Sequence, residues 1–186
     1  MKLLIRGSSI SAGFGVERSY PEIIASLSKG KKIELINRSR PFETSFDAIG
    51  TFYKDICPFQ PQVLLLHFGT DDAFLGVYRS EFQENLVQLI RLSRKHCSST
   101  VFLATSHTFD DPHDMEAVNI YYRAMRVVAQ DLGCYLIPVH IYWAGYLHER
   151  GLRNNDLTCP GGLYPNSEGH RVMADCISRW ILGILT

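Results

Sequence analysis

The sequence lacks an excess of charge of either sign, because its 19 lysines and arginines equal its 19 aspartates and glutamates. A protein that binds nucleic acid needs a basic surface to neutralise phosphates, and the composition provides no such excess. The sequence also lacks any run of about 18 apolar residues, the length that a membrane span requires. We therefore expect neither a nucleic-acid partner nor a membrane partner.

A disulfide framework is missing as well. The five cysteines include no C-x-x-C pair, and an odd number leaves at least one thiol unpaired. Reduced thiols are typical of cytoplasmic proteins, and the N-terminal "MKLLIRG" has too short an apolar core for a signal peptide. We expect a cytoplasmic protein without a cofactor, folded as one domain over residues 1–186, since this length suits one full core.

Short apolar runs alternate with longer segments of helical period. The predicted strands are Lys2 to Ile5, Lys32 to Ile36, Gln62 to His67, Thr100 to Thr105 and Tyr135 to Val139. The predicted helices are Tyr20 to Ser28, Asp47 to Ile56, Ser80 to Lys95, Asp114 to Leu132 and Ser167 to Leu185. Several strands are apolar on both faces, which is typical of buried parallel strands. Right-handed crossovers then predict a three-layer α/β/α fold with a flavodoxin-like sheet of five parallel strands.

Polar and glycine-rich segments follow the predicted strands, where ligands bind in parallel sheets of this kind. "GSSISAGFG" follows the first strand, "NRSRPFETS" the second, "FGTDDA" the third and "SHTFDD" the fourth. One interpretation of the first segment is a nucleotide-binding loop. Against it, the third glycine of G-x-G-x-x-G is missing and no acidic residue closes the second strand.

The other interpretation rests on four blocks that occur in order along the chain. Gly7, Ser9, Gly13 and Gly15 fit a G-D-S-x-T-x-G-x-G pattern, with Ser11 in the threonine position. "RPFETS", "GTDDA" and "YPNSEGHRVMA" follow, so the chain resembles the SGNH, or GDSL-type, hydrolases over nearly its whole length. The resemblance implies the fold of that superfamily, strand order 2-1-3-4-5, and Ser9 in the nucleophile position.

The same resemblance shows where the chain departs from the family pattern. Acyl transfer needs a base, a carboxylate that orients the base, and donors that face the developing oxyanion. Aligned on "PN", the D-x-x-H-P-N block has Tyr164 in the histidine position and Gly161 in the aspartate position. Asp71 replaces the oxyanion asparagine, Phe42 replaces the glycine of the second block, and Ser8 replaces the aspartate of G-D-S. We therefore expect an impaired or altered hydrolytic apparatus.

Other histidines are candidates for a relocated base. His107 is the first of them, because it follows the predicted fourth strand and should lie on the same sheet edge as Ser9. The alternative for His107 is a loop residue that fixes "SHTFDD" by hydrogen bonds. His170, at the start of the last helix, is expected to be structural, and His140 and His67 are weaker candidates.

Acidic and aromatic segments leave further alternatives open. Asp156, in the loop before Gly161, is a candidate for a displaced carboxylate. The "DDPHD" segment, residues 110–114, fits either a metal site or a polar loop that caps the next helix, and we predict no metal. Five aromatic residues fit either packing or the lining of a pocket for a sugar or acyl chain: Tyr121, Tyr122, Tyr142, Trp143 and Tyr146.

These residues lead to two functional hypotheses. The first is an SGNH-fold protein that binds a small acyl- or carbohydrate-type ligand at the strand ends. Its expected ligand-binding residues are Ser8, Phe42 and Tyr164. The second is an active serine esterase in which the nucleophile has recruited a histidine from elsewhere in the chain. Its expected catalytic residues are Ser9, Asp71 and His107.

Overall fold

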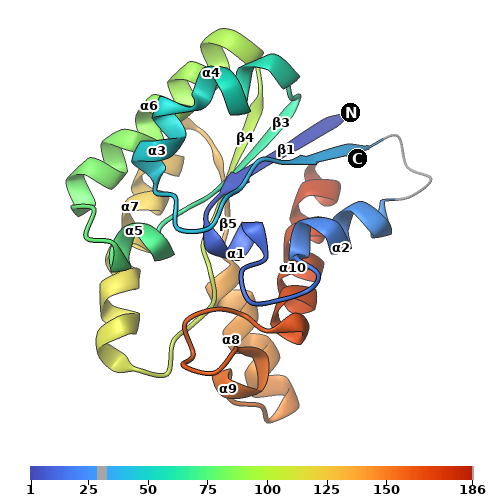
Figure 1. Cartoon of the computed structure of the whole chain (residues 1–186), viewed down its shortest axis with the longest axis vertical. Coiled ribbons are helices and arrows are strands. Elements are labelled where there is room, and N and C mark those ends of the chain that lie inside the picture. The colour runs from blue at the N-terminus through green and yellow to red at the C-terminus, as the bar shows by residue number, and fades with distance from the viewer. Residues whose placement is uncertain (29–32, 186) are drawn as a thin grey trace.

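A sheet of five parallel strands in the order β2-β1-β3-β4-β5 forms the centre of the protein (Figure 1). The computed structural model describes residues 1–28 and 33–185. The strands are β1 (Lys2–Gly7), β2 (Glu34–Asn37), β3 (Val63–His67), β4 (Thr100–Ala104) and β5 (Tyr135–Ile137). The predicted fold class and the strand order that the resemblance implied are both confirmed.

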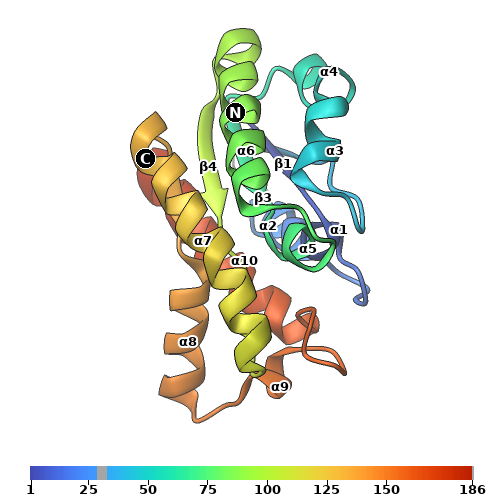
Figure 2. The same cartoon turned by 90° about the vertical axis from the view of Figure 1, so that its left-hand side faces the viewer.

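Helices cover both faces of the sheet (Figures 1 and 2). One face is covered by α3 (Ser45–Gly50), α4 (Phe52–Asp55), α6 (Arg79–Cys97) and α7 (Pro112–Leu132). The other is covered by α2 (Tyr20–Leu27), α8 (Val139–Arg150) and α10 (Ser167–Leu185). The connections contain α1 (Ser9–Ala12), α5 (Thr70–Phe74), α9 (Asn154–Leu157) and the 3-10 turn η1 (Cys57–Phe59). No helix in the described part of the chain has the length and apolar character needed to cross a bilayer.

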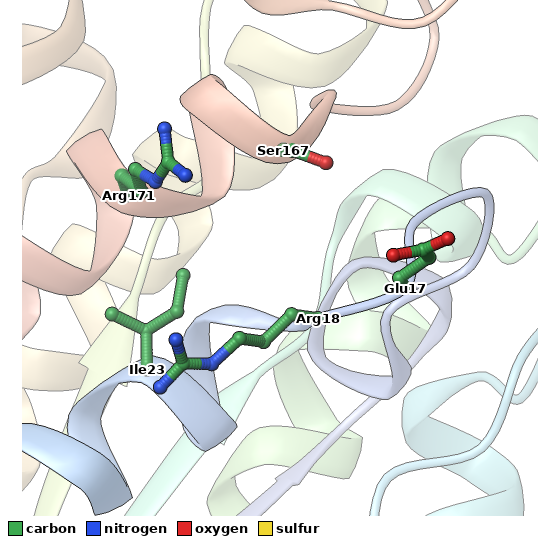
Figure 3. A pocket seen from close by; sticks show the side chains of 5 residues that line it. All are labelled: Glu17, Arg18, Ile23, Ser167 and Arg171. Atoms are coloured by element: carbon green, nitrogen blue, oxygen red, sulfur yellow. The ribbon is translucent and has the colours of Figure 1, made fainter.

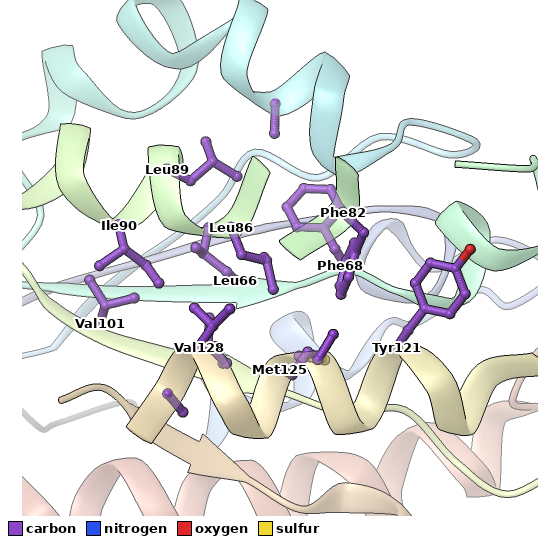
Figure 4. Packing of buried hydrophobic residues seen from close by; sticks show 14 of the residues in the cluster. Leu66, Phe68, Phe82, Leu86, Leu89, Ile90, Val101, Tyr121, Met125 and Val128 are labelled. Atoms are coloured by element: carbon purple, nitrogen blue, oxygen red, sulfur yellow. The ribbon is translucent and has the colours of Figure 1, made fainter. Parts of the chain in front are cut away.

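The two faces have separate cores because successive side chains of a strand point in opposite directions. In β3, Leu64 and Leu66 belong to the cluster under α6 and α7, whereas Val63 and Leu65 belong to the cluster under α2, α8 and α10. Figure 4 shows the first cluster, in which side chains of α6 and α7 meet over Leu66. The central strands are thus buried on both faces, as their continuous apolar runs predict.

Predicted and observed bounds in the first half differ by one or two residues at several elements, and one predicted helix is divided into two. The strand predicted from Lys32 to Ile36 is observed as Glu34–Asn37, and Lys32 lies outside the described residues. The helix predicted from Asp47 to Ile56 is interrupted at Thr51, which ends α3 and precedes α4. The Asp47 carbonyl oxygen accepts from both the Thr51 N–H and the Thr51 hydroxyl, and such a second bond from a threonine side chain often bends a helix.

The strand predicted to reach Val139 ends at Ile137. Pro138 follows, has no N–H to donate to a ladder, and is the N-cap of α8. The sequence interpretation missed α8 altogether. This helix buries Trp143, whose indole N–H donates to the Asn154 side-chain oxygen over 2.7 Å, so one of the aromatic residues considered for a ligand pocket is a core residue.

β3 supplies side chains to both cores, so truncation there tests the arrangement of the layers. We expect Leu65→Ala to lower the free energy of unfolding by about 3 kcal/mol, because a fully buried leucine leaves a cavity when it is truncated. Urea-induced unfolding measures the change. The matched control is Leu75→Ala, which removes a leucine that is 54% exposed and should change stability by less than about 0.5 kcal/mol. Equal losses in the two variants would contradict this description of the core.

Candidate functional site

The turn after β1 places Ser9 at the carboxyl edge of the sheet. Ser8 is the N-cap of α1 and Ser9 its first residue, and both are buried. Gly7 lets this turn pass close to β3, because a Cβ at that position would lie 2.5 Å from the His67 carbonyl oxygen. Gly13 ends α1 with φ +80, in the left-handed region that favours glycine. The glycines of the first block therefore shape the backbone that presents Ser9.

Ser9 is hydrogen-bonded through both its side chain and its backbone. The Phe42 N–H donates to Ser9 Oγ over 2.9 Å, and the Ser9 N–H donates to Asp71 Oδ2 over 2.8 Å. The Tyr164 hydroxyl donates to the other Asp71 oxygen over 3.2 Å. The structure thus brings together Ser9, Phe42, Asp71 and Tyr164 from four separate segments of the chain.

Tyr164 lies next to Ser9 and Asp71, and its hydroxyl is protonated at neutral pH. Partial burial raises the pKa of Tyr164 above the ordinary value of about 10, and the Asp71 charge raises it further, while a hydrogen bond with Ser9 acts in the opposite direction. A phenol with a raised pKa is a poor base for a serine hydroxyl.

Phe42 has a left-handed backbone with φ +62, which is rare for a bulky residue. Such a conformation costs about 1–3 kcal/mol and persists only where the surrounding structure holds it. Glu43, the next residue, forms ion pairs with the buried Arg6 of β1 and with Arg40. These ion pairs anchor the connection between β2 and α3 at the position where the Phe42 N–H meets Ser9 Oγ.

Three aromatic rings cluster beside these hydrogen bonds. The Phe14 ring centroid lies 4.8 Å from that of Phe42 and 5.1 Å from that of Tyr164, both in edge-to-face contact. Phe14 is 40% exposed and Phe42 is 51% exposed, whereas Ser9 is fully buried. We refer to Phe14, Phe42 and Tyr164 as the aromatic trio. The sequence interpretation missed Phe14, although its position directly after Gly13 in the first block was an available signal.

His107 has hydrogen-bond partners other than Ser9. Its Nδ1 lies 2.9 Å from Ser106 Oγ, and its Nε2 lies 3.5 Å from the Gly162 carbonyl oxygen. The ring is buried and packs against two other aromatic side chains. Across residues 1–28 and 33–185, no histidine is hydrogen-bonded to Ser9.

A buried serine–histidine pair that the sequence interpretation missed lies two residues beyond Ser9. Ser11 Oγ lies 2.9 Å from His67 Nδ1, and the Tyr20 hydroxyl lies 3.0 Å from each of these atoms. Burial lowers the pKa of His67 to about 3. Because all three side chains are buried and the imidazole is such a weak base, the pair is suited to holding the first turn rather than to activating a nucleophile.

His170 also has a structural contact. Its Nδ1 accepts a hydrogen bond from the Tyr20 backbone N–H over 3.0 Å, which ties α10 to the start of α2. Burial lowers the pKa of His170 and that of His107 to about 4 each. Together with His67, they are neutral inside the protein at neutral pH.

The acidic segments make local contacts. Asp111 accepts hydrogen bonds from two backbone N–H groups in the first turn of α7, as the capping interpretation predicts, and Asp110 accepts one from the Asn154 side chain. Asp156 accepts one from the Arg153 N–H at the start of α9. In the part of the chain that the structure describes, no group of three or more His, Cys, Asp or Glu side chains is arranged to hold a metal ion.

A pocket of about 350 Å³ opens between the start of α10 and the segment that leads into α2 (Figure 3). Its lining residues are Glu17, Arg18, Ile23, Ser167 and Arg171. The basic side chains have partners, because Arg18 hydrogen-bonds to Ser26 and Arg171 pairs with Glu168. Ser167 and Arg171 belong to the fourth block of the sequence, but none of the predicted catalytic or ligand-binding residues lines this pocket.

Comparison with known proteins decides the family. Residues 5–172 match the GDSL-like lipase/acylhydrolase family model. The chain belongs to this family. Over 106 residues it is 26% identical to an arylesterase of Vibrio mimicus, covering 55% of this chain and 53% of that protein. Over 91 residues it is 32% identical to the uncharacterized lipoprotein YqeF of Bacillus subtilis, covering 42% of this chain and 37% of that protein. The matches thus span about half or less of these relatives.

Solved structures share the fold over almost the whole chain. The acetyl xylan esterase AlAXEase has a TM-score of 0.85 at 21% identity, covering 95% of this chain and 98% of that one. Axe2, an acetylxylan esterase from Geobacillus stearothermophilus, has a TM-score of 0.82 at 18% identity, covering 96% and 92%. At these identities the likeness establishes the fold.

The three neutral histidines make stability depend on pH. An unfolded histidine has a pKa near 6.5, so the unfolded chain takes up protons as the pH falls below that value, while the folded chain does not. Stability is therefore complete above about pH 6.5 and falls toward pH 4, by about 1.4 kcal/mol per pH unit for each such histidine. Urea unfolding at pH 7.5, 6.5 and 5.5 measures this slope.

His170→Asn is the informative variant, because the asparagine side-chain oxygen can replace the acceptor Nδ1 but does not titrate. It should flatten the slope, whereas His148→Asn, at an exposed position of α8, should leave it unchanged. The same steep loss of stability in wild type and His170→Asn would contradict this assignment.

Proposed function

We propose that this GDSL-family protein binds a small ester or acylated ligand at the carboxyl edge of its sheet and hydrolyses it weakly. The observation that carries the proposal is the hydrogen bonding of Ser9. Its Oγ is buried, accepts a hydrogen bond from the Phe42 N–H, and has no histidine partner among the described residues. Esterase names among the relatives support an ester as the ligand class.

Ester hydrolysis requires activation of the Ser9 hydroxyl, and this site lacks the group that would activate it. A serine hydroxyl attacks a carbonyl carbon efficiently only when a base removes its proton in the same step. The neighbouring Tyr164 is a protonated phenol with a raised pKa, and its hydroxyl donates to Asp71. Loss of the base in a serine hydrolase costs about six orders of magnitude in rate, which leaves only residual catalysis.

Ester hydrolysis also requires stabilisation of the oxyanion, and the site is poorly suited to this as well. Two backbone donors meet at this site, but the Ser9 N–H donates to Asp71 and the Phe42 N–H donates to Ser9 Oγ. Asp71 also presents a negative carboxylate where the family resemblance expects a donating amide. Two unit charges about 4 Å apart repel by roughly 4 kcal/mol at an effective dielectric constant near 20, so this carboxylate opposes the developing oxyanion.

Weak hydrolysis predicts that Ser9 contributes little to the observed rate. Purified protein should hydrolyse p-nitrophenyl acetate slowly, and Ser9→Ala should change that rate by less than about twofold, because the hydroxyl is not activated. Release of p-nitrophenol, followed by absorbance, measures both rates. Rapid turnover that Ser9→Ala abolishes would instead support the active-esterase hypothesis, and His107→Ala would then test the relocated base.

Restoring the missing groups should restore part of the activity. Tyr164→His supplies a base and Asp71→Asn supplies a donor, and the two act as a unit. The double variant should therefore hydrolyse the same ester at least about tenfold faster than either single variant, in a manner that Ser9→Ala removes. Gly161→Asp is left out, because Gly161 has φ +93 and an aspartate there would be strained. A double variant no faster than wild type would show that the arrangement around Ser9 differs from the one described.

A further inference from the structure

Asp71 is a buried carboxylate without a basic partner among the described residues. Its exposed fraction is 2%, and its two hydrogen bonds come from neutral groups, the Ser9 N–H and the Tyr164 hydroxyl. None of the ion pairs in residues 1–28 and 33–185 includes it. Aspartate is rarely buried unless it is paired, because a buried charge loses its hydration. Both Asp71 oxygens accept a hydrogen bond, but no cation among the described residues offsets the charge, so a cation from outside the chain would stabilise it.

The charges around Asp71 do not supply that partner. The adjacent Asp72 is also buried and accepts hydrogen bonds from the neutral N–H and hydroxyl of Ser45 and from the Gly69 N–H. Arg6, Arg38 and Arg40 pair with Glu43 and Asp55 and with neither of these aspartates. Burial raises the pKa of Asp72, which favours its neutral form, so the carboxylate that lacks a cationic partner in the described residues is that of Asp71.

The aromatic trio supplies a second element of recognition beside this charge. The Tyr164 hydroxyl contacts Asp71 directly, and the Phe14 ring joins the rings of Tyr164 and Phe42. The face of an aromatic ring carries a partial negative charge and attracts cations, most strongly those that are weakly hydrated. Because Phe14 and Phe42 remain partly exposed, a ligand can reach their rings.

The strained backbone of Phe42 indicates that its ring has a role, because a phenylalanine in this conformation raises the free energy of the folded state. Glycine, which the family resemblance expects here, adopts φ +62 without strain, whereas phenylalanine does not. The same N–H would be available with either residue, so the ring itself is the difference. We propose that the aromatic trio and Asp71 bind the cationic head group, an alkylated ammonium, of an organic ligand. This inference rests on the proposed binding function and names the chemical class of its ligand.

A neutral sugar is the competing ligand class, because sugars also stack on aromatic rings and donate to carboxylates. A neutral ligand would leave the Asp71 charge uncompensated, whereas an ammonium group would offset it and contact the rings as well. The Asp71 carboxylate, which has no ion pair among the described residues, therefore favours the cation.

The test compares two esters of nearly equal shape by calorimetric titration of the full chain. Acetylcholine carries a trimethylammonium group, and 3,3-dimethylbutyl acetate carries a tert-butyl group in its place. The cationic ester should bind about tenfold more tightly at low salt, and the difference should shrink as salt is added. Asp71→Asn and Phe14→Leu should each remove most of the preference. Phe46→Leu, at a phenylalanine of α3 that is 61% exposed and lies outside the trio, should leave it unchanged.

The outcomes separate this inference from the proposed function. Equal affinity for the two esters would overturn the cation preference and leave the ester-binding function in place. Binding of neither ester, nor of an acetylated xyloside, would overturn both. Fast hydrolysis that requires Ser9 would overturn the weak-hydrolysis proposal, and the ratio of KM values for the two esters would then report the cation preference. Thermal melting checks that each variant is folded. If Asp71→Asn does not fold, Phe14→Leu still tests the cation preference.

Discussion

The hydrogen bond from the Ser9 N–H to Asp71 joins the turns that follow β3, the central strand of the sheet, and β1, one of its two neighbours. It commits a backbone donor at the nucleophile position to a carboxylate inside the same chain. Tyr164 and Phe42 then complete the arrangement by donating to Asp71 and to Ser9 Oγ respectively. The chemistry open to the site follows from this: its donors are satisfied internally, and its remaining charge is negative.

This arrangement contains two features that lower the stability of a folded protein unless other interactions compensate for them. One is a buried aspartate whose partners are neutral, and the other is a phenylalanine with a left-handed backbone. Both contact Ser9, Asp71 at its backbone N–H and Phe42 at its hydroxyl oxygen. Arg6, from the centre of the sheet, anchors Glu43 beside Phe42, while the double-sided core keeps β1 and β3 in register. Departures from local preference are expected at functional sites, and here they coincide with the edge where α/β sheets bind ligands.

Much of the fold was predictable because its central strands are buried on both faces. Continuous apolar runs such as "VLLL" in β3 can satisfy that burial only as interior strands. Elements at the margins were less predictable. α8 was missed because Pro138 ends a short edge strand and starts a helix at once. The pair of α3 and α4 was predicted as one helix because the break falls at Gly50 and Thr51, and a single glycine inside a helical pattern does not by itself show that the helix ends. The strand order itself came from the family resemblance.

The fold class, the place of Ser9 after the first strand, and the absence of histidine, aspartate and asparagine from their family positions could all be predicted, because they depend on residue identity and order along the chain. Which groups contact one another could be learned only from the folded chain. Phe14 joins Phe42 and Tyr164, and His107 contacts Ser106 and Gly162 instead of Ser9. Such contacts join residues that are distant in sequence, and their geometry is set by how helices pack on the two faces of the sheet. Residue order alone does not specify distances of this kind.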